Sequence, residues 1–493
     1  MKDMNWFAVY PELLLLVAAL AVAMIDLWVS DPRRRPTYLL TQATLLVVAA
    51  LHLAYYNGGA TVYAMQRMVV TDAMGHLLAF FATLATMITL AYARPYAESR
   101  DMLRGELFTL ALFCLLGIAV LVQANNFLVV YLGLELMSLS LYAATALRRD
   151  HPQATEAAMK YFVLGALSSG FLLYGLSMMY GATGSLDIPQ VFDAIAAGQI
   201  NRTVLTFGLV FVVAGVAFKL GVVPFHMWIP DVYHGAPTAV TLLIAGAPEF
   251  AAFAMAFRLL VEGLSGLAVD WQQMLVVLAV GSLVVGNIAA IAQTNLKRML
   301  AYSTIGQMGF MLLGFTPTVI AGNTLSAANG YSSALFYLLT YVFTTLGTFG
   351  TIMLLARAGF EADQIADFAG LARRSPWYAG VMAILMFSLA GIPPTVGFYA
   401  KLAVLQALVS TNVAGYIWLA VVAVLLSLIG AYYYLRVVKV MYFDAPSDAH
   451  PIASSGEVRT VLSLNGAAIL LFGILPGGLM AMCAHAIQRA VST

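Results

Sequence analysis

Hydrophobic runs of about 20 residues follow one another along almost the whole chain, and they limit the folds that it can adopt. Of the 493 residues, 62% are hydrophobic and only 10% are charged. Soluble domains are about half apolar and about a quarter charged, so a soluble fold could not cover this much apolar surface. Lipid offers a free backbone no hydrogen-bond partner, which leaves helices or a closed barrel. Because the alternating strands of a barrel are missing, the sequence predicts an all-α integral membrane protein.

The runs and the residues that interrupt them predict about fourteen transmembrane helices. We expect them near residues 9–28, 38–56, 72–93, 106–122, 126–147, 157–180, 204–228, 238–261, 271–292, 297–315, 332–356, 377–409, 416–441 and 460–485.

Alternate threading of these helices places the basic residues unequally. One side holds Arg33, Arg34, Arg35, Arg94, Arg100, Arg104, Arg148, Arg149, Lys297, Arg298, Arg357, Arg373, Arg374, Arg436, Lys439 and Arg459. The other side holds only Lys2, Arg67, Arg202 and Arg489. Since basic loops stay in the cytoplasm, the pattern predicts a multi-pass protein of the bacterial inner (plasma) membrane with both termini on the periplasmic side.

Composition gives no sign of a cofactor or of a nucleic-acid partner. The formal net charge is +1, and the two cysteines, Cys114 and Cys483, are too few to hold an iron–sulfur cluster. The histidines lack the paired spacing of a metal site, and the chain has no phosphate loop, dinucleotide fingerprint or flavin motif. The sequence therefore predicts no cofactor in this chain and no nucleic-acid binding, so any redox chemistry must take place in other chains.

Proline interrupts two of the hydrophobic segments in similar contexts. Pro224 lies in the seventh predicted helix, and Pro393 and Pro394 lie in the twelfth. An offset of five helices makes the two segments run in opposite directions, which favours two inverted five-helix repeats whose broken helices define the transport sites. The alternative is that membrane helices simply tolerate proline.

The repeats predict four segments. We expect an N-terminal three-helix segment at 1–104, a first repeat at 105–262, a second repeat at 263–443, and a C-terminal loop with the last helix at 444–493.

Glu135 lies in the middle of the fifth helix, where a charge costs roughly 2.5 to 3.5 kcal/mol on the mildest insertion scale. Tyr131, Glu135, Ser138 and Tyr142 are spaced so that they share one helical face. Such a face can carry hydroxyl groups or water beside a functional carboxylate. The alternative is a protonated glutamic acid that is merely packed in the core.

Four further charges fall inside hydrophobic segments. Lys219 precedes the break at Pro224, and Lys401 follows the double proline; both lie too deep for ordinary snorkelling, so we expect them to hold or release protons. Glu249 is a second buried carboxylate, on a stripe with Thr238 and Thr241. Lys160 is nearer the cytoplasmic side, where a relay residue and an ordinary interfacial lysine are both open.

Two other features leave a structural and a functional interpretation open. Arg258, near the outer end of the eighth helix, is expected to act as an interfacial anchor. The eleventh helix carries a polar stripe of Tyr337, Tyr341, Thr344 and Thr348. These hydroxyls either satisfy helix carbonyls or line a wetted path.

Segments 126–138, 219–231, 233–238 and 391–401 resemble the antiporter-like membrane subunits of bacterial NADH:quinone oxidoreductase (respiratory complex I). Within these the Tyr-His-Gly-Ala-Pro-Thr stretch at 233–238 looks like the subunit N family, and the likeness spans roughly 125–441. It implies an assembly with other membrane-arm subunits in the lipid bilayer. FMN and iron–sulfur clusters are then expected in other subunits of the complex.

The resemblance also implies a proton channel in which Glu135 and Lys219 act as a coupled pair, continued by a central residue and Lys401. Protons and water are the expected ligands. Glu249 departs from the family pattern, which often has lysine after Ala-Pro in the eighth helix. We therefore expect a translocating enzyme subunit that couples electron transfer from NADH to quinone to proton pumping. The alternatives are a subunit of a Mrp-like cation/proton antiporter and a structural subunit without its own channel.

Overall fold

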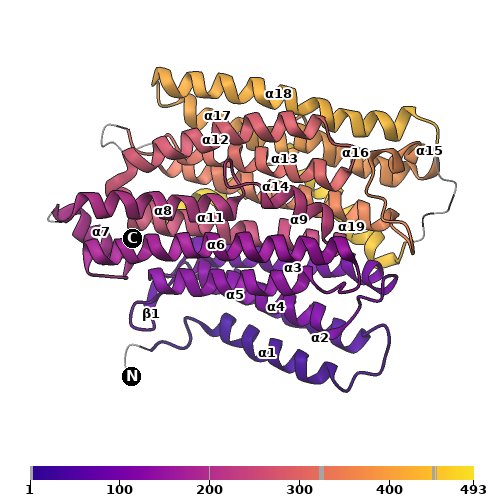
Figure 1. The fold of residues 1–493 in the computed structure, drawn as a ribbon, viewed down its shortest axis with the longest axis horizontal. Coiled ribbons are helices and arrows are strands. Elements are labelled where there is room, and N and C mark those ends of the chain that lie inside the picture. Colours follow the sequence, from indigo (N-terminus) through magenta and orange to yellow (C-terminus); the bar gives the residue numbers. More distant parts are fainter. Residues whose placement is uncertain are drawn as a thin grey trace.

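The computed structural model describes residues 4–492 apart from 199, 321–326, 447–449, 451 and 453. Helices that run side by side make up almost all of it (Figure 1). The first part contains α1 (Tyr10–Asp26), α2 (Arg35–Gly58), β1 (Val62–Ala64), β2 (Val69–Thr71), α3 (Ala73–Glu98), α4 (Gly105–Val122), α5 (Phe127–Thr145), α6 (Pro152–Thr183), α7 (Ile188–Ala197), α8 (Arg202–Leu220), α9 (Trp228–Gly235), α10 (Thr238–Ala245), α11 (Pro248–Ala256) and η1 (Phe257–Gly263).

The second part continues with helices of the same kind. It contains η2 (Ser265–Leu267), α12 (Ala268–Ile291), α13 (Leu296–Leu312), η3 (Leu313–Phe315), α14 (Ala327–Leu355), η4 (Ile365–Phe368), α15 (Leu371–Arg374), α16 (Pro376–Ala390), α17 (Val396–Val409), α18 (Ala414–Phe443), α19 (Gly456–Ile474) and α20 (Gly477–Ser492).

Each predicted span corresponds to helix. Among the described residues, eleven helices are long and apolar enough to cross a membrane. The other three predicted spans are α1, α13 and the pair α16 and α17. The prediction of an all-α membrane fold is therefore confirmed, and each of the about fourteen predicted spans corresponds to helix.

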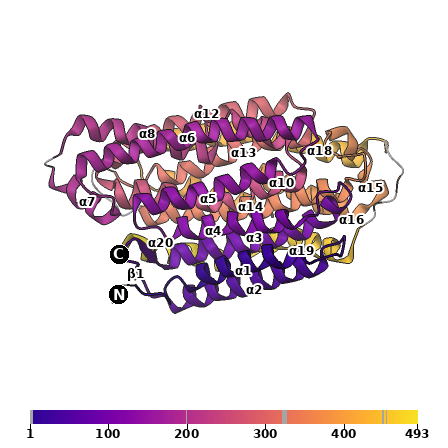
Figure 2. The same cartoon turned by 60° about the horizontal axis from the view of Figure 1, so that its bottom comes forward.

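The bundle has two chemically different ends. Both termini lie at one end, here called the terminal end (Figures 1 and 2), as an even number of spans requires. The opposite end, here called the arginine-rich end, carries the loops with Arg33, Arg100, Arg148, Arg357 and Arg373. Lys2, predicted for the terminal end, lies outside the described residues.

The two predicted helix breaks are present and are built alike. Residues 221–227 separate α8 from α9, and residues 391–395 separate α16 from α17. Each first half-helix ends on a glycine with positive φ, 64° at Gly221 and 83° at Gly391. The backbone N–H of the next residue then donates a hydrogen bond to the carbonyl five positions earlier. Val222 donates to Ala217 at 3.0 Å, and Ile392 donates to Phe387 at 2.9 Å. Such matched breaks fit the two inverted repeats, while the exact segment boundaries at 104, 262 and 443 stay a prediction.

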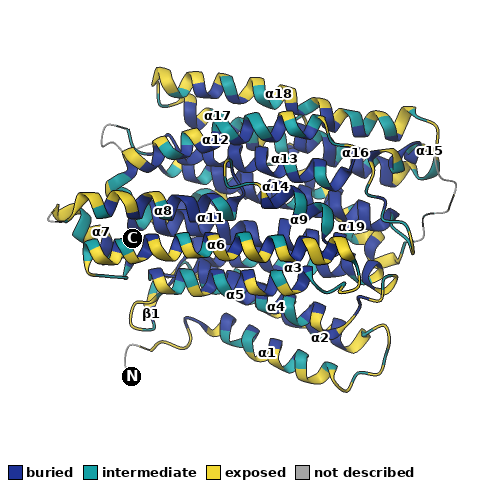
Figure 3. Cartoon of the chain, in the orientation of Figure 1, coloured by how far each residue is buried: buried dark blue, intermediate teal, exposed yellow. Residues whose placement is uncertain are grey.

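Two spans are enclosed by protein. The most apolar part of 238–263 is 100% buried and that of α14 is 94% buried, whereas α18 is only 17% buried. Figure 3 shows the same contrast between the dark blue interior helices and the yellow outer face of α18. Since the outward residues of α18 are apolar, that face suits lipid, and the two enclosed spans form the core around which the polar residues gather.

Some local structure departs from the prediction. The last span is not one helix at 460–485, because Pro476 follows the end of α19 and a new helix, α20, begins at Gly477. The eighth span is interrupted at Gly246, between α10 and α11, so the expected continuous stripe from Thr238 to Glu249 is broken. The β1–β2 hairpin and the short helix α7 occupy stretches for which no element was predicted.

Candidate functional site

Polar side chains form a row through the middle of the bundle, and we call this row the central polar axis. It consists of Glu135, Ser138, Ser169, Lys219, Glu249, Thr304, Gln307, Tyr337, Tyr341, Ser388, Lys401, Ser427 and Tyr434. Glu135, Thr304, Tyr341 and Ser427 each lie near the midpoint of their helix, in α5, α13, α14 and α18. The axis is therefore far from both ends of the bundle.

Glu135 and Lys219 occupy one end of the axis. The Ser169 hydroxyl of α6 donates a hydrogen bond to the Glu135 carboxylate. The Lys219 ammonium donates to Ser138, one turn beyond Glu135 on α5, at 3.3 Å. Among ion pairs of the described residues, none joins Glu135 to Lys219 directly; each is hydrogen-bonded to a serine, and the two groups interact electrostatically.

A small cavity lies between these groups. Ser138, Tyr142, Ser169 and Lys219 line it, and its volume is about 10 Å³, close to what one water needs. Two residues of the predicted polar face of α5, Ser138 and Tyr142, therefore point into a polar space.

Both lysines of the axis are partly buried and lie at the carboxyl end of a broken half-helix, but they reach it from different elements. Lys219 is in the last turn of α8 itself. Lys401 belongs to α17 and reaches back to the last turn of α16, donating to the carbonyls of Leu389 at 3.1 Å and Ala390 at 3.0 Å. Because this end of a helix carries partial negative charge, it stabilises an ammonium group in the middle of the bundle.

Glu249 lies at the centre of the axis, inside the most enclosed span. It is 6% exposed, and its Oε2 has no hydrogen-bond partner among the described residues. Its carboxylate interacts electrostatically with Lys219 and with Tyr341. Because α11 begins at Pro248, Glu249 is in its first turn, where the positive end of the helix dipole favours a carboxylate.

Hydroxyl and amide groups continue the axis toward Lys401. Tyr341 donates to Thr304 at 2.7 Å, and Gln307 donates to Tyr434 at 2.9 Å. Lys401 donates to Ser427 at 2.7 Å. Two further cavities of about 10 Å³ each touch Lys401, one beside α14 and α16 and one beside α12 and α18.

The residues of the polar stripe of α14 do not all support the same interpretation. Tyr337, Tyr341 and Thr344 line the cavity beside Lys401. Thr348 instead donates to the carbonyl of Thr344 at 2.8 Å. Thr344 also donates to the carbonyl of Thr340 at 2.8 Å. The wetted-path interpretation therefore fits Tyr337 and Tyr341, carbonyl satisfaction fits Thr348, and Thr344 fits both.

Lys160 lies apart from the axis. Its side chain is 42% exposed and forms ion pairs with Glu156 at 2.9 Å and with Asp231 of α9 at 2.7 Å. Asp231 also pairs with Arg298 at 2.7 Å. This ion cluster is near the arginine-rich end, and a relay role for Lys160 stays a prediction.

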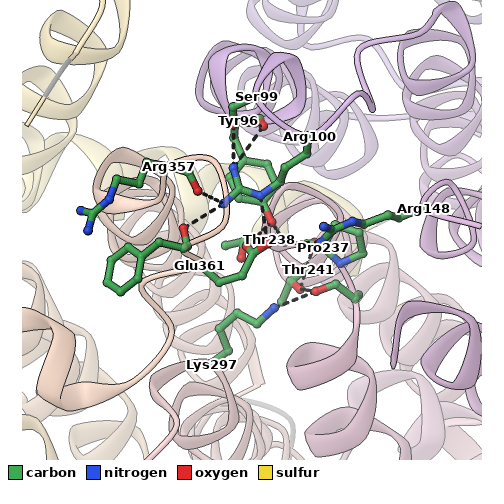
Figure 4. Close-up of polar contacts among 12 residues, drawn as sticks. Tyr96, Ser99, Arg100, Arg148, Pro237, Thr238, Thr241, Lys297, Arg357 and Glu361 are labelled. Atoms are coloured by element: carbon green, nitrogen blue, oxygen red, sulfur yellow. Dashed lines mark hydrogen bonds and ion pairs between the residues drawn. The ribbon is translucent and has the colours of Figure 1, made fainter. Parts of the chain in front are cut away.

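Glu361 organises a second ion cluster at the arginine-rich end (Figure 4). It accepts hydrogen bonds from Tyr96 at 2.7 Å, Arg100 at 3.0 Å and Arg148 at 3.2 Å, and Tyr96 accepts one from the Thr238 amide at 3.1 Å. Burial raises the pKa of Glu361, but the bonds from Arg100 and Tyr96 outweigh burial and hold that pKa below its usual value. Glu361 is therefore ionised at neutral pH and ties three loops to the start of α10.

Lys297 lies in the same region, in the first turn of α13. It is 4% exposed and donates to the Ala236 carbonyl at 2.7 Å, between α9 and α10. In the sequence, Lys297 looks like one of the exposed charges of the cytoplasmic loops. Its apolar neighbours Leu296, Met299 and Leu300 were the only sequence sign that this lysine is buried.

Arg258 does not lie at an interface, so its expected role as an anchor is wrong. It is 1% exposed and pairs with Asp72 at 2.8 Å and with Glu262 at 2.6 Å. It also donates to the Val122 carbonyl at 3.0 Å. The prediction failed because the main partner, Asp72, comes from a span that is remote in sequence.

Comparison with known proteins adds a family context to this geometry. Residues 124–430 match the family described as NADH:quinone oxidoreductase/Mrp antiporter, TM. The chain is 62% identical over 493 residues to the NADH-quinone oxidoreductase subunit N of Polaromonas naphthalenivorans, with 99% of each chain covered.

Two solved structures share the fold. A chain of respiratory complex I from Thermus thermophilus with bound aureothin is 29% identical, with a TM-score of 0.81 and coverage of 97% of this chain and 100% of that one. A chain of the Mrp complex from Dietzia sp. DQ12-45-1b is 21% identical, with a TM-score of 0.85 and coverage of 99% and 98%. At that identity, the second comparison speaks for the fold alone.

Proposed function

Because the chain belongs to the subunit N family of NADH-quinone oxidoreductases, we propose that it translocates protons in the membrane arm of such a complex. Electron transfer from NADH to quinone, carried out by FMN and iron–sulfur clusters in other subunits, drives the movement. Other membrane-arm subunits and the surrounding lipid are its partners. The protons and the water that carries them are its ligands.

One observation supports this proposal most strongly. Two ammonium groups, on Lys219 and Lys401, lie in the middle of the bundle at the negative ends of half-helices. A structural subunit has no need for such groups, since charges at this depth are costly. A proton carrier needs groups that stay buried in both protonation states, and dipoles of this kind favour that.

The proposed path follows the central polar axis. A proton held by Lys219 passes to Glu249, with which its ammonium interacts electrostatically. The hydroxyls of Tyr341 and Thr304, joined at 2.7 Å, lead on toward Gln307 and Lys401. Glu135 at the start of the axis sets the charge state of Lys219, because a carboxylate favours the ammonium and a protonated acid does not.

The second candidate function is ion exchange within a Mrp-like antiporter, since the Mrp chain has the same fold. Co-migration after mild solubilisation of native membranes separates the candidates. We expect the chain to migrate with a flavin-containing complex that oxidises NADH. Migration alone, or only with other antiporter subunits, would contradict the proposal.

The one-sided arginines lead to a prediction about orientation. Single cysteines at Ser185 and Asn412, at the terminal end, should react in intact cells with a membrane-impermeant thiol reagent. A cysteine at Ser454, at the arginine-rich end, should stay unreactive until the membrane is opened. The native Cys114 and Cys483 are buried and give a low background. The reverse labelling pattern would place the termini in the cytoplasm.

A further inference from the structure

A second group of buried titratable side chains lies in the N-terminal three-helix segment, away from the central polar axis. Glu12 comes from the start of α1, His52 from the last part of α2, and His76 from the first turn of α3. Their exposures are 8%, 1% and 2%. The group is thus buried near the terminal end, whereas the central polar axis lies at mid-helix.

The three side chains form a directed row of polar contacts. The Nε2 of His52 is 3.9 Å from a Glu12 carboxylate oxygen. Its Nδ1 is 3.2 Å from the Nδ1 of His76, which also lies 3.4 Å from the Gln123 amide nitrogen. Since that amide nitrogen only donates, the His76 Nδ1 accepts, and the His52 Nδ1 carries the proton between the rings.

The Glu12 carboxylate has weak polar contacts with the Gln123 side chain and with its own backbone amide, but no well-formed hydrogen bond to any described residue. A buried ionised carboxylate without hydrogen bonds is strongly disfavoured, so Glu12 is either a neutral acid or paired with a protonated His52. In its resting form the pair therefore shares one proton.

A polar connection leads from this group toward the terminal end. Asp72, one turn before His76 on α3, interacts with it electrostatically and pairs with Arg258 at 2.8 Å. Gly75 lets Asp72 and Gln123 approach the start of α3 closely, because a Cβ at this residue would lie 3.1 Å from the Asp72 carboxylate and 3.2 Å from Gln123. Arg258 and Glu262 in turn line a pocket of about 390 Å³.

We propose that Glu12, His52 and His76 form a separate proton-holding site, which exchanges its proton with water at the terminal end through the Asp72, Arg258 and Glu262 connection. This site lies outside the proton path proposed above and does not depend on it. The groups that face it are Tyr55, Asp72 and Gln123, and Arg258 lies behind Asp72.

The proton transfers balance along the row. The Glu12 O–H bond breaks as a bond forms to the His52 Nε2, and the His52 Nδ1–H breaks as one forms to the His76 Nδ1. His76 then releases its Nε2 proton toward the terminal end, which leaves both rings neutral and leaves the ionised Glu12 as acceptor of the new His52 Nε2–H. The reverse sequence returns a proton to Glu12.

Labelling with dicyclohexylcarbodiimide tests the proposal in the assembled complex. This membrane-soluble reagent adds to protonated carboxyl groups and leaves a stable N-acylurea that mass spectrometry assigns to a residue. An apolar groove of about 550 Å³ between α1 and α2 is lined by Leu13, the residue that follows Glu12, and can take up such an apolar reagent. We expect Glu12 to be labelled in native membranes, and labelling to slow severalfold as the pH on the terminal side is raised.

Two variants of His76 and one control variant show whether the row carries the proton. In His76→Phe, which cannot accept a proton, labelling of Glu12 should continue but no longer follow the pH at the terminal side. Thr41→Val is the matched control, because Thr41 is buried on the same helix as His52 and bonds only to the Thr37 carbonyl. The Thr41→Val complex should behave as the unaltered complex. His76→Gln checks that altered packing around residue 76 is not the cause of the effect of His76→Phe.

Two results would overturn the proposal. One is a Glu12 that stays unlabelled at every pH, and the other is labelling in the unaltered complex that ignores the pH of the terminal side. Failure of the main proton path is distinguishable, since Lys219→Ala should leave the labelling of Glu12 and its pH dependence unchanged.

Discussion

Lys219→Ala should reduce proton pumping by about a hundredfold, the lower range of what a positioned proton-transfer group contributes. The substitution removes the ammonium group that bonds to Ser138 and interacts with both Glu135 and Glu249. Glu249 then loses its nearest positive charge, and the axis is cut at its first step. Because pumping and electron flow are linked, quinone reduction should fall as well.

Inverted membrane vesicles provide the measurement. Proton uptake driven by NADH is compared at equal complex content, which is set by NADH oxidation with an artificial electron acceptor. Glu135→Gln should give a similar loss, whereas Lys439→Ala, which removes a 62% exposed lysine paired with Asp444, should keep normal pumping. An assembled Lys219→Ala complex with full pumping would remove Lys219 from the mechanism.

Glu249→Gln should impair pumping more than Glu249→Asp does. Glutamine keeps the shape of the side chain but cannot take up or release a proton, whereas aspartate can. A relay at this position requires a titratable group, since Glu249 interacts electrostatically with both Lys219 and Tyr341. The expected loss for glutamine is again about a hundredfold.

Glu249→Lys tests whether proton pumping also depends on the sign of the charge at this position. In the first turn of α11 a lysine faces the positive end of the helix dipole, and it repels Lys219 where the glutamate attracts it. We therefore expect less pumping than with aspartate. Glu98→Gln, which alters a half-exposed glutamate paired with Arg33, is the control. Normal pumping by Glu249→Gln would identify Glu249 as a packing residue.

The fold was predictable because the membrane imposes strong local rules. Apolar runs gave the spans, and Pro224 and the Pro393–Pro394 pair marked two breaks. Glu135, Lys219 and Lys401 stood out since a charge in an apolar run is costly wherever its partners lie. Pro476 carried the same kind of signal, but one proline in a membrane helix is too common to identify a break.

The partners of these charges were not predictable. Gln307 meets Tyr434 across 127 residues of sequence, and Arg258 reaches Val122 across 136. Nothing in the local pattern around Gln307 or Arg258 specifies such contacts, because they depend on how separate spans pack. The same reason hid His52 and His76, which look like isolated histidines in the sequence and lie 3.2 Å apart in the fold.

The depth of the central polar axis has an electrical consequence. Glu135, Tyr341 and Ser427 each lie near the midpoint of a spanning helix, so they share nearly one level between the two membrane faces. Moving an elementary charge across the whole membrane potential involves about 2.3 kcal/mol per 100 mV. A proton that travels sideways at constant depth crosses almost none of that voltage. The applied voltage would therefore act on the entry and exit of protons, and the lateral transfer would proceed at the same rate in energised and de-energised membranes.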